Sequence, residues 1–233
     1  MIKRASIISL AFTCITCMYA HADDRSSFYA KIEGGGSFPS HALNAEFYHN
    51  TKAPNSIFLG AGIGYLINDH LRSDLTLTFR PTSRLSHSRR YIDDLNYTEE
   101  INQDFSSATL MCNTYYNFYK LGSFSPYILG GIGFSRNYMG NYFSRDIPAG
   151  SSEHIVGSSN SSTKFSPAWT LGIGTNLGIS KDFDLDVFYR YGNLGKSGKI
   201  TVTETFNSGT RQTTLTPARL KSHEVGFGFL VRF

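Results

Sequence analysis

The sequence predicts an all-β fold: an eight-stranded antiparallel up-and-down transmembrane β-barrel with short periplasmic turns and long extracellular loops. Three observations lead to this prediction. Apolar and polar residues alternate in eight segments, the connections between segments alternate between short and long, and aromatic residues gather near segment ends. The composition agrees, because 14% aromatic residues, 22 Gly and only 17% charged residues describe a folded chain rich in strand and turn formers.

The alternation is clearest in residues 71–80. Leu75, Leu77 and Phe79 share one face there, and charged or hydroxyl side chains share the other. Glycines occupy the second face in two further segments, and three others show the pattern more weakly. The candidate strands, in chain order, are residues 28–37, 57–67, 71–80, 105–118, 126–136, 169–179, 184–191 and 224–233.

The connections favour a membrane barrel over a soluble protein. A soluble β-sandwich shows the same periodicity, but a compact soluble domain seldom has four long loops. An even number of strands, each long enough for a tilted span, and aromatic strand ends also favour the barrel. The predicted short turns are residues 68–70, 119–125 and 180–183, and the predicted long loops are residues 38–55, 81–103, 137–166 and 193–217.

Two of the long loops have recognisable patterns. Residues 150–163 are serine-rich and of low complexity, which predicts a mobile segment. Residues 200–206 and 211–215 alternate around Asn207-Ser208-Gly209. That arrangement predicts a hairpin that extends the last two strands above the membrane.

The N-terminal segment has the order of a secretory signal peptide. Lys3 and Arg4 precede an apolar stretch, which ends at the small-x-small sequence formed by Ala20 and Ala22. We therefore expect cleavage after Ala22, with residues 1–22 as signal peptide and residues 23–233 as the barrel domain.

The remaining cysteine and the net charge exclude several classes. Cys112 is then the one thiol of the exported chain, so a disulfide framework is not expected, and its strand position predicts a small packing residue. The net charge of +4 falls to near neutral without Lys3 and Arg4, so we expect no nucleic-acid partner.

The C-terminal strand resembles a known assembly signal. Val225, Phe227, Phe229 and Val231 alternate up to Phe233, which is similar to the signal that the barrel-assembly machinery reads in bacterial outer-membrane barrels. The stretch 125–133 is similar to the Pro-Tyr-and-glycine strand of the small eight-stranded outer-membrane barrel family, which includes OmpA-type, OmpX-type and opacity-protein-like surface antigens.

This resemblance implies a function and a location. A member of the family would be a monomeric surface protein of a Gram-negative outer membrane, in contact with membrane lipid and lipopolysaccharide. Its role would be structural or antigen- and adhesin-like, with loops that contact host surface molecules. A narrow porin and a lipid A-modifying barrel enzyme stay as alternatives.

The polar face predicts an ion-pair network inside the barrel. An eight-stranded barrel is just wide enough for side chains to fill it, and a buried charge is costly unless it is paired. One register of the last two strands puts Arg190 close to Glu224 and Asp184 close to Arg232. The other charged residues expected in the lumen are Lys31, Glu33, Arg72, Asp74 and Asp186.

Outside the lumen, the sequence offers two histidine-containing motifs and a basic cluster as candidate sites, and the evidence for each is weaker. Ser86-His87-Ser88 and Glu153-His154 lack the spacing of a nucleophile, base and orienting acid. We therefore expect no enzymatic activity, no catalytic residues, no cofactor and no bound metal. A basic cluster could meet lipopolysaccharide phosphates or could be solvated loop charge, and it is offset by nearby Asp and Glu residues. Its members are Arg80, Arg84, Arg89 and Arg90.

Overall fold

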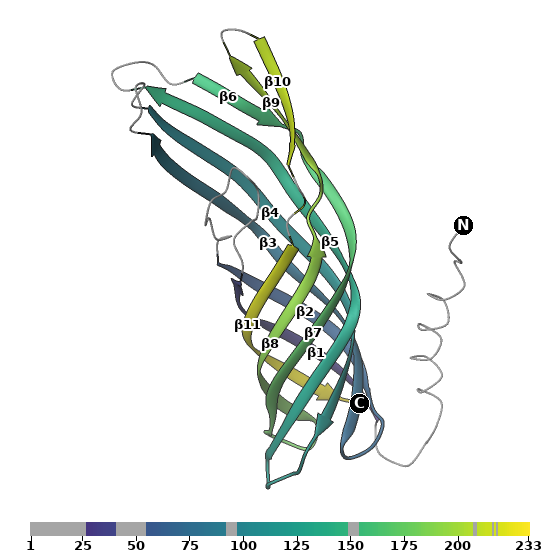
Figure 1. Cartoon of the computed structure of the whole chain (residues 1–233). Coiled ribbons are helices and arrows are strands. Elements are labelled where there is room, and N and C mark those ends of the chain that lie inside the picture. The colour runs from purple at the N-terminus through teal and green to yellow at the C-terminus, as the bar shows by residue number, and fades with distance from the viewer. Residues whose placement is uncertain are drawn as a thin grey trace, which may run out of the picture.

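The computed structural model describes residues 27–40, 55–91, 97–148, 154–206, 209–215, 217 and 219–233 (Figure 1). Within these ranges, no helix is long and apolar enough to cross a membrane. The strands are β1 Phe28–Pro39, β2 Ser56–Leu66, β3 Leu71–Tyr91, β4 Tyr97–Asn117, β5 Phe124–Pro148, β6 His154–Ser159, β7 Ser162–Gly178, β8 Phe183–Lys196, β9 Ile200–Phe206, β10 Gly209–Leu215 and β11 Arg219–Arg232.

Eight of these strands close into an antiparallel barrel, which confirms the predicted fold. The ring runs β1, β2, β3, β4, β5, β7, β8 and β11, and β11 pairs with β1. Short turns join the strands at one end of the barrel, which we call the turn rim. Asn68 shapes one of these turns, because its Oδ1 accepts hydrogen bonds from the backbone N–H groups of His70 at 2.9 Å and Leu71 at 2.8 Å. The opposite end is the loop rim.

Beyond the loop rim, the barrel wall continues as strands (Figure 1). β6 pairs with the far end of β5, β9 pairs with β6, and β10 pairs with β9. In effect β6 extends β7, β9 extends β8, and β10 extends β11. The predicted hairpin of the fourth loop is present as β9 and β10.

The structure differs from the prediction in the length of two loops. Most of residues 81–103 belongs to β3 and β4, and most of residues 137–166 belongs to β5, β6 and β7. The serine-rich segment contributes to β6 and β7, and residues 149–153 lie outside the described ranges. Beyond the membrane an outward side chain no longer has to be apolar, so backbone pairing continues after the alternation has disappeared. Of the predicted first loop, only its ends are described.

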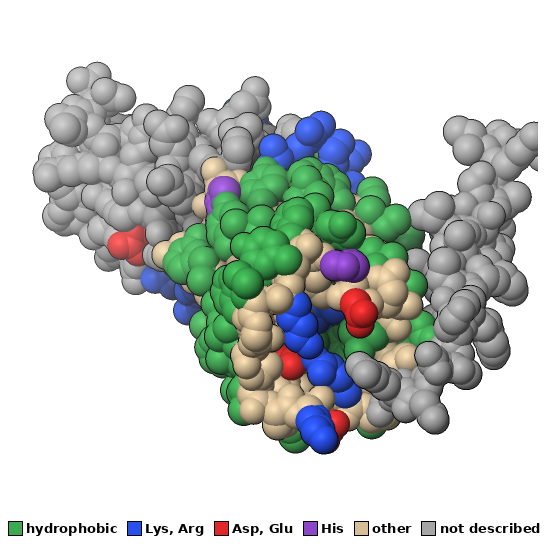
Figure 2. Space-filling view, turned by 90° about the horizontal axis from the view of Figure 1, so that it is seen from below, with side chains coloured by type: hydrophobic (Ala, Val, Ile, Leu, Met, Phe, Trp, Pro, Cys, Tyr) green, Lys and Arg blue, Asp and Glu red, His purple; other side chains and the backbone are tan. Residues whose placement is uncertain are grey.

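The wall is apolar outside and polar inside. Leu59, Leu77 and Leu171 are 56–61% exposed on the outer face, whereas Thr76 and Thr78 on the inner face are 1–2% exposed. Seen from the turn rim, green hydrophobic side chains surround a centre that contains charged groups (Figure 2). This distribution of apolar and polar side chains is the reverse of that in a soluble protein, and a lipid environment requires it.

Exposed aromatic side chains mark both rims on the outer face, as transmembrane barrels show at the two interfaces of a membrane. The group at the turn rim comprises Phe28, Tyr116, Phe118, Tyr119, Phe124, Phe183 and Phe233, and the group at the loop rim comprises Phe38, Phe165, Trp169 and Tyr189.

Candidate functional site

The lumen contains a connected network of charged side chains. Lys31 Nζ lies 2.7 Å from Asp74 Oδ2 and 3.3 Å from Glu33 Oε2. Arg190 Nη1 lies 2.8 Å from Glu33 Oε1, and Arg190 Nε lies 2.6 Å from Glu224 Oε2. These contacts join β1, β3, β8 and β11 across the barrel. Each charge is compensated by a near neighbour, as a dry interior demands.

Glu224 pairs with two arginines of the lumen. It is 1% exposed, and its Oε1 lies 2.6 Å from Nη2 of Arg80, while Arg190 donates to its second oxygen. The Ser37 and Ser222 hydroxyls donate to Oε1 at 3.2 and 3.4 Å. The two serines and Arg80 approach from three different strands.

The structure removes Arg80 from the basic cluster that the sequence predicts at the loops. Its side chain is 6% exposed and faces the lumen, because it continues the inward row of Thr76 and Thr78. Arg84 lies outside on the same strand, 72% exposed, where its Nε donates to Asp104 Oδ1 at 3.0 Å. The side chains of Arg89 and Arg90 lie outside the described residues.

Arg72 lies among tyrosine rings. Its Cζ is 4.1 Å from the centroid of Tyr115, 5.0 Å from that of Tyr127 and 5.8 Å from that of Tyr29. Asp186 is its carboxylate partner, at 3.8 Å from Nη2, and also accepts a hydrogen bond of 2.6 Å from the Tyr127 hydroxyl. Stacking on aromatic faces suits a guanidinium, which is weakly hydrated and planar.

Tyr29 and Tyr115 lie near the ends of β1 and β4, but they do not join the outer aromatic groups at the rims. Both rings point inward and are 0–3% exposed. The Tyr29 hydroxyl donates to Asp74 at 3.2 Å, and the Tyr115 hydroxyl accepts from Lys31 at 2.7 Å. Both residues therefore belong to the lumen network.

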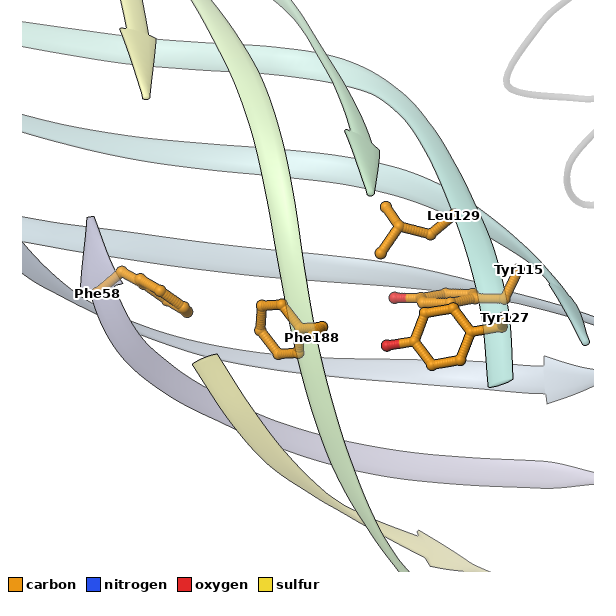
Figure 3. Close-up of a cluster of buried hydrophobic side chains, with 5 residues drawn as sticks. All are labelled: Phe58, Tyr115, Tyr127, Leu129 and Phe188. Atoms are coloured by element: carbon orange, nitrogen blue, oxygen red, sulfur yellow. The ribbon is translucent and has the colours of Figure 1, made fainter. Parts of the chain in front are cut away.

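An apolar cluster fills the lumen beside the charges. It consists of Phe58, Tyr115, Tyr127, Leu129 and Phe188 (Figure 3). The rings of Phe58 and Phe188 lie 6.1 Å apart, and Gly226 faces them. A Cβ at Gly226 would lie 2.6 Å from Phe58 and 2.8 Å from Phe188, so this position needs glycine. Charges and rings together occupy the lumen, so we expect it to be closed to ions.

We expect the folded protein in a planar bilayer to show no ion conductance above background, because paired charges and packed rings occupy the lumen. Single-channel recording checks this, with a trimeric porin as the positive control. Reproducible steps from the wild-type protein would contradict a closed lumen. They would favour the narrow-porin alternative.

Asp184 and Arg232 meet near the turn rim. Arg232 Nη2 pairs with Asp184 Oδ2, and Arg232 Nη1 donates to the backbone oxygen of Lys181 at 3.1 Å. The partners sit on β8 and β11, two positions from direct register. The structure thus brings together both predicted pairs, Arg190 with Glu224 and Asp184 with Arg232. It also brings Arg72 to Asp186 and Asp74 to Lys31.

The strands beyond the loop rim carry a pocket of about 380 Å³. It lies at a bulge, where the register of β4 and β5 shifts between Gln103 and Phe105. Aromatic, amide and guanidinium groups line it, a mixture that suits a polar ligand. The lining residues are Arg84, Asn102, Gln103, Asp104, Tyr138, Gly140, Asn141, Phe143 and Arg145.

The remaining candidate residues lie on strands that are not neighbours or outside the described residues. His87 lies on β3 and His154 on β6, and β4 and β5 separate these strands. The side chains of Ser86, His87, Ser88 and His154, together with residue 153, lie outside the described residues, as do Ala20 and Ala22. In the C-terminal row, Val225, Phe227, Phe229 and Phe233 are 41–65% exposed on the outer face, and Val231 is half-buried.

Comparison with known proteins agrees with this architecture. The model of the outer membrane protein beta-barrel domain matches residues 7–233. A Rickettsia conorii protein named "Putative adhesin RC1281" is 26% identical over 185 residues, covering 76% of this chain and 72% of that protein. Outer membrane protein PagN of Salmonella typhimurium is 27% identical over 161 residues, covering 66% of this chain and 63% of PagN.

A solved structure shares the fold. Neisserial surface protein A (NspA) superposes with a TM-score of 0.52 at 16% sequence identity, covering 91% of this chain and 100% of NspA. At this identity the likeness concerns the arrangement of strands.

Proposed function

This chain belongs to the outer membrane protein beta-barrel domain family, and from that premise we propose that it is a surface-interaction protein that binds through the strands beyond its loop rim. Its place is the bacterial outer membrane, so the loop rim faces outward and the turn rim faces the periplasm. We propose an adhesin-like role toward host surface molecules. The name of the Rickettsia relative, a putative adhesin, supports it.

One observation carries this proposal: hairpins beyond the loop rim are built as paired strands. β5 extends to Pro148, and β9 and β10 pair from Ile200 with Leu215 to Phe206 with Gly209. A paired sheet holds its side chains in fixed positions, so binding loses less conformational entropy than it would with a flexible loop. The pocket at the β4–β5 bulge lies on this sheet of paired strands beyond the loop rim.

The test displays the protein on an outer-membrane expression host and measures adhesion to a panel of host cells and matrix proteins. In the first variant, Asn-Gly replaces residues 204–211, which joins the register partners Thr203 and Gln212 by a two-residue turn. A second variant is Tyr138→Ala with Phe143→Ala, in the pocket. We expect wild-type cells to adhere, and at least one variant to fall to the level of the empty host.

The matched control replaces Lys181-Asp182 in a periplasmic turn with Asn-Gly and should adhere like the wild type. Heat-modifiable gel mobility shows that every variant folds. Equal adhesion by all folded variants would remove the hairpins and the pocket from the account. A structural envelope role would then be the better reading, and mass spectrometry of lipid A would test the enzyme alternative.

Membership of this family also leads to three proposals about the processing and assembly of the protein. We propose that the signal peptide is removed after Ala22, that the barrel-assembly machinery reads the row from Val225 to Phe233, and that the barrel is a monomer. The outer face of β11 supports the second point, since its aromatic side chains are exposed where a receptor or lipid can reach them.

A further inference from the structure

Three basic side chains gather on the outer wall near the loop rim, and we call them the rim cluster. Lys196 on β8 and Arg219 on β11 are register partners, and both are exposed. Lys221 shares the outward row of Val225 and is half-buried. None of the described carboxylates forms a salt bridge with these three cations.

A row of aromatic rings in contact with one another lies immediately below the rim cluster, toward the membrane centre. The ring centroid of Trp169 is 5.7 Å from that of Tyr191, which is 5.1 Å from that of His223. The Tyr189 hydroxyl lies 2.6 Å from His223 Nδ1, which fixes the imidazole. These rings cross β7, β8 and β11 on the lipid-facing side and mark the level of the outer-leaflet headgroups.

The spacing along β11 places the cations just outside that level. Lys221 precedes His223 by two residues, about 7 Å along a strand, and Arg219 precedes it by four, about 13 Å. The periplasmic turns show no such excess of positive charge. Their described charged residues are Lys120, Lys181, Asp69 and Asp182, which cancel. The unpaired positive charge therefore belongs to one side of the membrane.

We propose that the rim cluster and the ring row form a binding site for the phosphorylated glycolipid of the outer leaflet, lipid A. Arg219, Lys221 and Lys196 bind its phosphates, and Trp169 with Tyr191 contacts the sugar and the adjoining acyl chains. The site is an open outer wall that faces lipid, so its occupant is a lipid headgroup and not a soluble anion. The inference rests on the outer-membrane location and is independent of the adhesive function.

This site differs from the basic cluster that the sequence indicated. Arg80 is committed to Glu224 inside the barrel, and Arg84 already has Asp104 as partner. Arg219 and Lys221 were hidden in the sequence because they flank a register shift between β8 and β11. Only the closed barrel brings Lys196 beside them.

The single tryptophan of the chain, Trp169, provides the readout. Purified protein in phosphatidylcholine nanodiscs is titrated with bisphosphorylated lipid A while Trp169 emission is followed. We expect a saturable change in emission. We expect Arg219→Gln with Lys221→Gln to weaken binding about tenfold or more, because each basic side chain near an anionic lipid surface raises the affinity several-fold. The wild-type protein should bind dephosphorylated lipid A as weakly as the double variant binds bisphosphorylated lipid A. Inorganic phosphate should not change Trp169 emission.

The matched control is Lys120→Gln with Lys181→Gln, which removes the same charge from the periplasmic turns and should bind lipid A like the wild type. Gel mobility confirms folding of both double variants. Equal affinity for phosphorylated and dephosphorylated lipid A, or unchanged affinity in the Arg219 and Lys221 variant, would overturn the proposal. Adhesion should survive in this variant, so failure here and failure of the adhesive function are separate results.

Discussion

Replacing Glu224 with Gln is expected to lower the free energy of unfolding by about 3–5 kcal/mol, the cost of leaving a buried charge without its partner. The side chain is 1% exposed and compensates both Arg80 and Arg190, each at 2.6 Å. Glutamine keeps the volume but removes the charge. Arg190 still has Glu33, whereas Arg80 has no other described carboxylate partner. Urea unfolding in lipid vesicles, followed by Trp169 emission, measures the change.

The control for this prediction is Asp104→Asn, which also removes one carboxylate from an arginine. Arg84 in that pair is 72% exposed, so the loss should stay within about 1 kcal/mol. Similar losses for Glu224→Gln and Asp104→Asn would mean that water reaches the lumen and screens Arg80. The closed-lumen interpretation would then be wrong.

Phe188→Ala is expected to cost about 3–5 kcal/mol of unfolding free energy, because it empties a space that no lipid can fill. Phe188 is 5% exposed, packs 6.1 Å from Phe58 between ring centroids, and lies 5.0 Å below the guanidinium carbon of Arg190. The substitution removes apolar burial, leaves a cavity, and takes away one of the two rings under Arg190. The same urea titration measures it.

Two variants separate these contributions. Phe227→Ala removes the same side chain from the lipid-facing surface, where Phe227 is 55% exposed and acyl chains can close the gap. It should lose only the transfer free energy, about 1.5–3 kcal/mol. Phe188→Leu keeps most of the volume and loses the aromatic face, so it should fall between wild type and Phe188→Ala. Equal costs for Phe188→Ala and Phe227→Ala would show that the lumen relaxes around the missing ring.

The sequence was sufficient for the strands that cross the membrane and for part of the lumen. Alternation has a period of two, so the polar face follows once the apolar face is known, and one register placed Arg190 beside Glu224. It did not assign Tyr29 and Tyr115 to the lumen, because a tyrosine near a strand end suits either an interface or a lumen. Strand parity was the available signal, since Tyr29 shares its row with Lys31 and Glu33.

The part beyond the membrane could not be predicted in the same way. There both faces of the sheet can be polar, so residues 81–91 and 137–148 carry no alternation to distinguish a strand from a loop. Register shifts add to the difficulty, because the bulge between Gln103 and Phe105 changes which side chains share a face. The pocket and the rim cluster both depend on such shifts and required the three-dimensional structure.

The pairing of β1 with β11 has a consequence for the order of folding. Tyr29 pairs with Arg232, roughly 200 residues away along the chain, whereas the other seams of the barrel join strands that are near in sequence. Closing so long a loop carries the largest entropic cost, so this seam is expected to form last. Until then β1 and β11 are open edges. Arg190 of β8 is the register partner of Glu224 on β11, but Glu224 meets Ser37 of β1 and Arg80 of β3 only in the sealed ring. The buried ion pairs that cross this seam therefore stabilise the closed barrel. A partly assembled sheet lacks them.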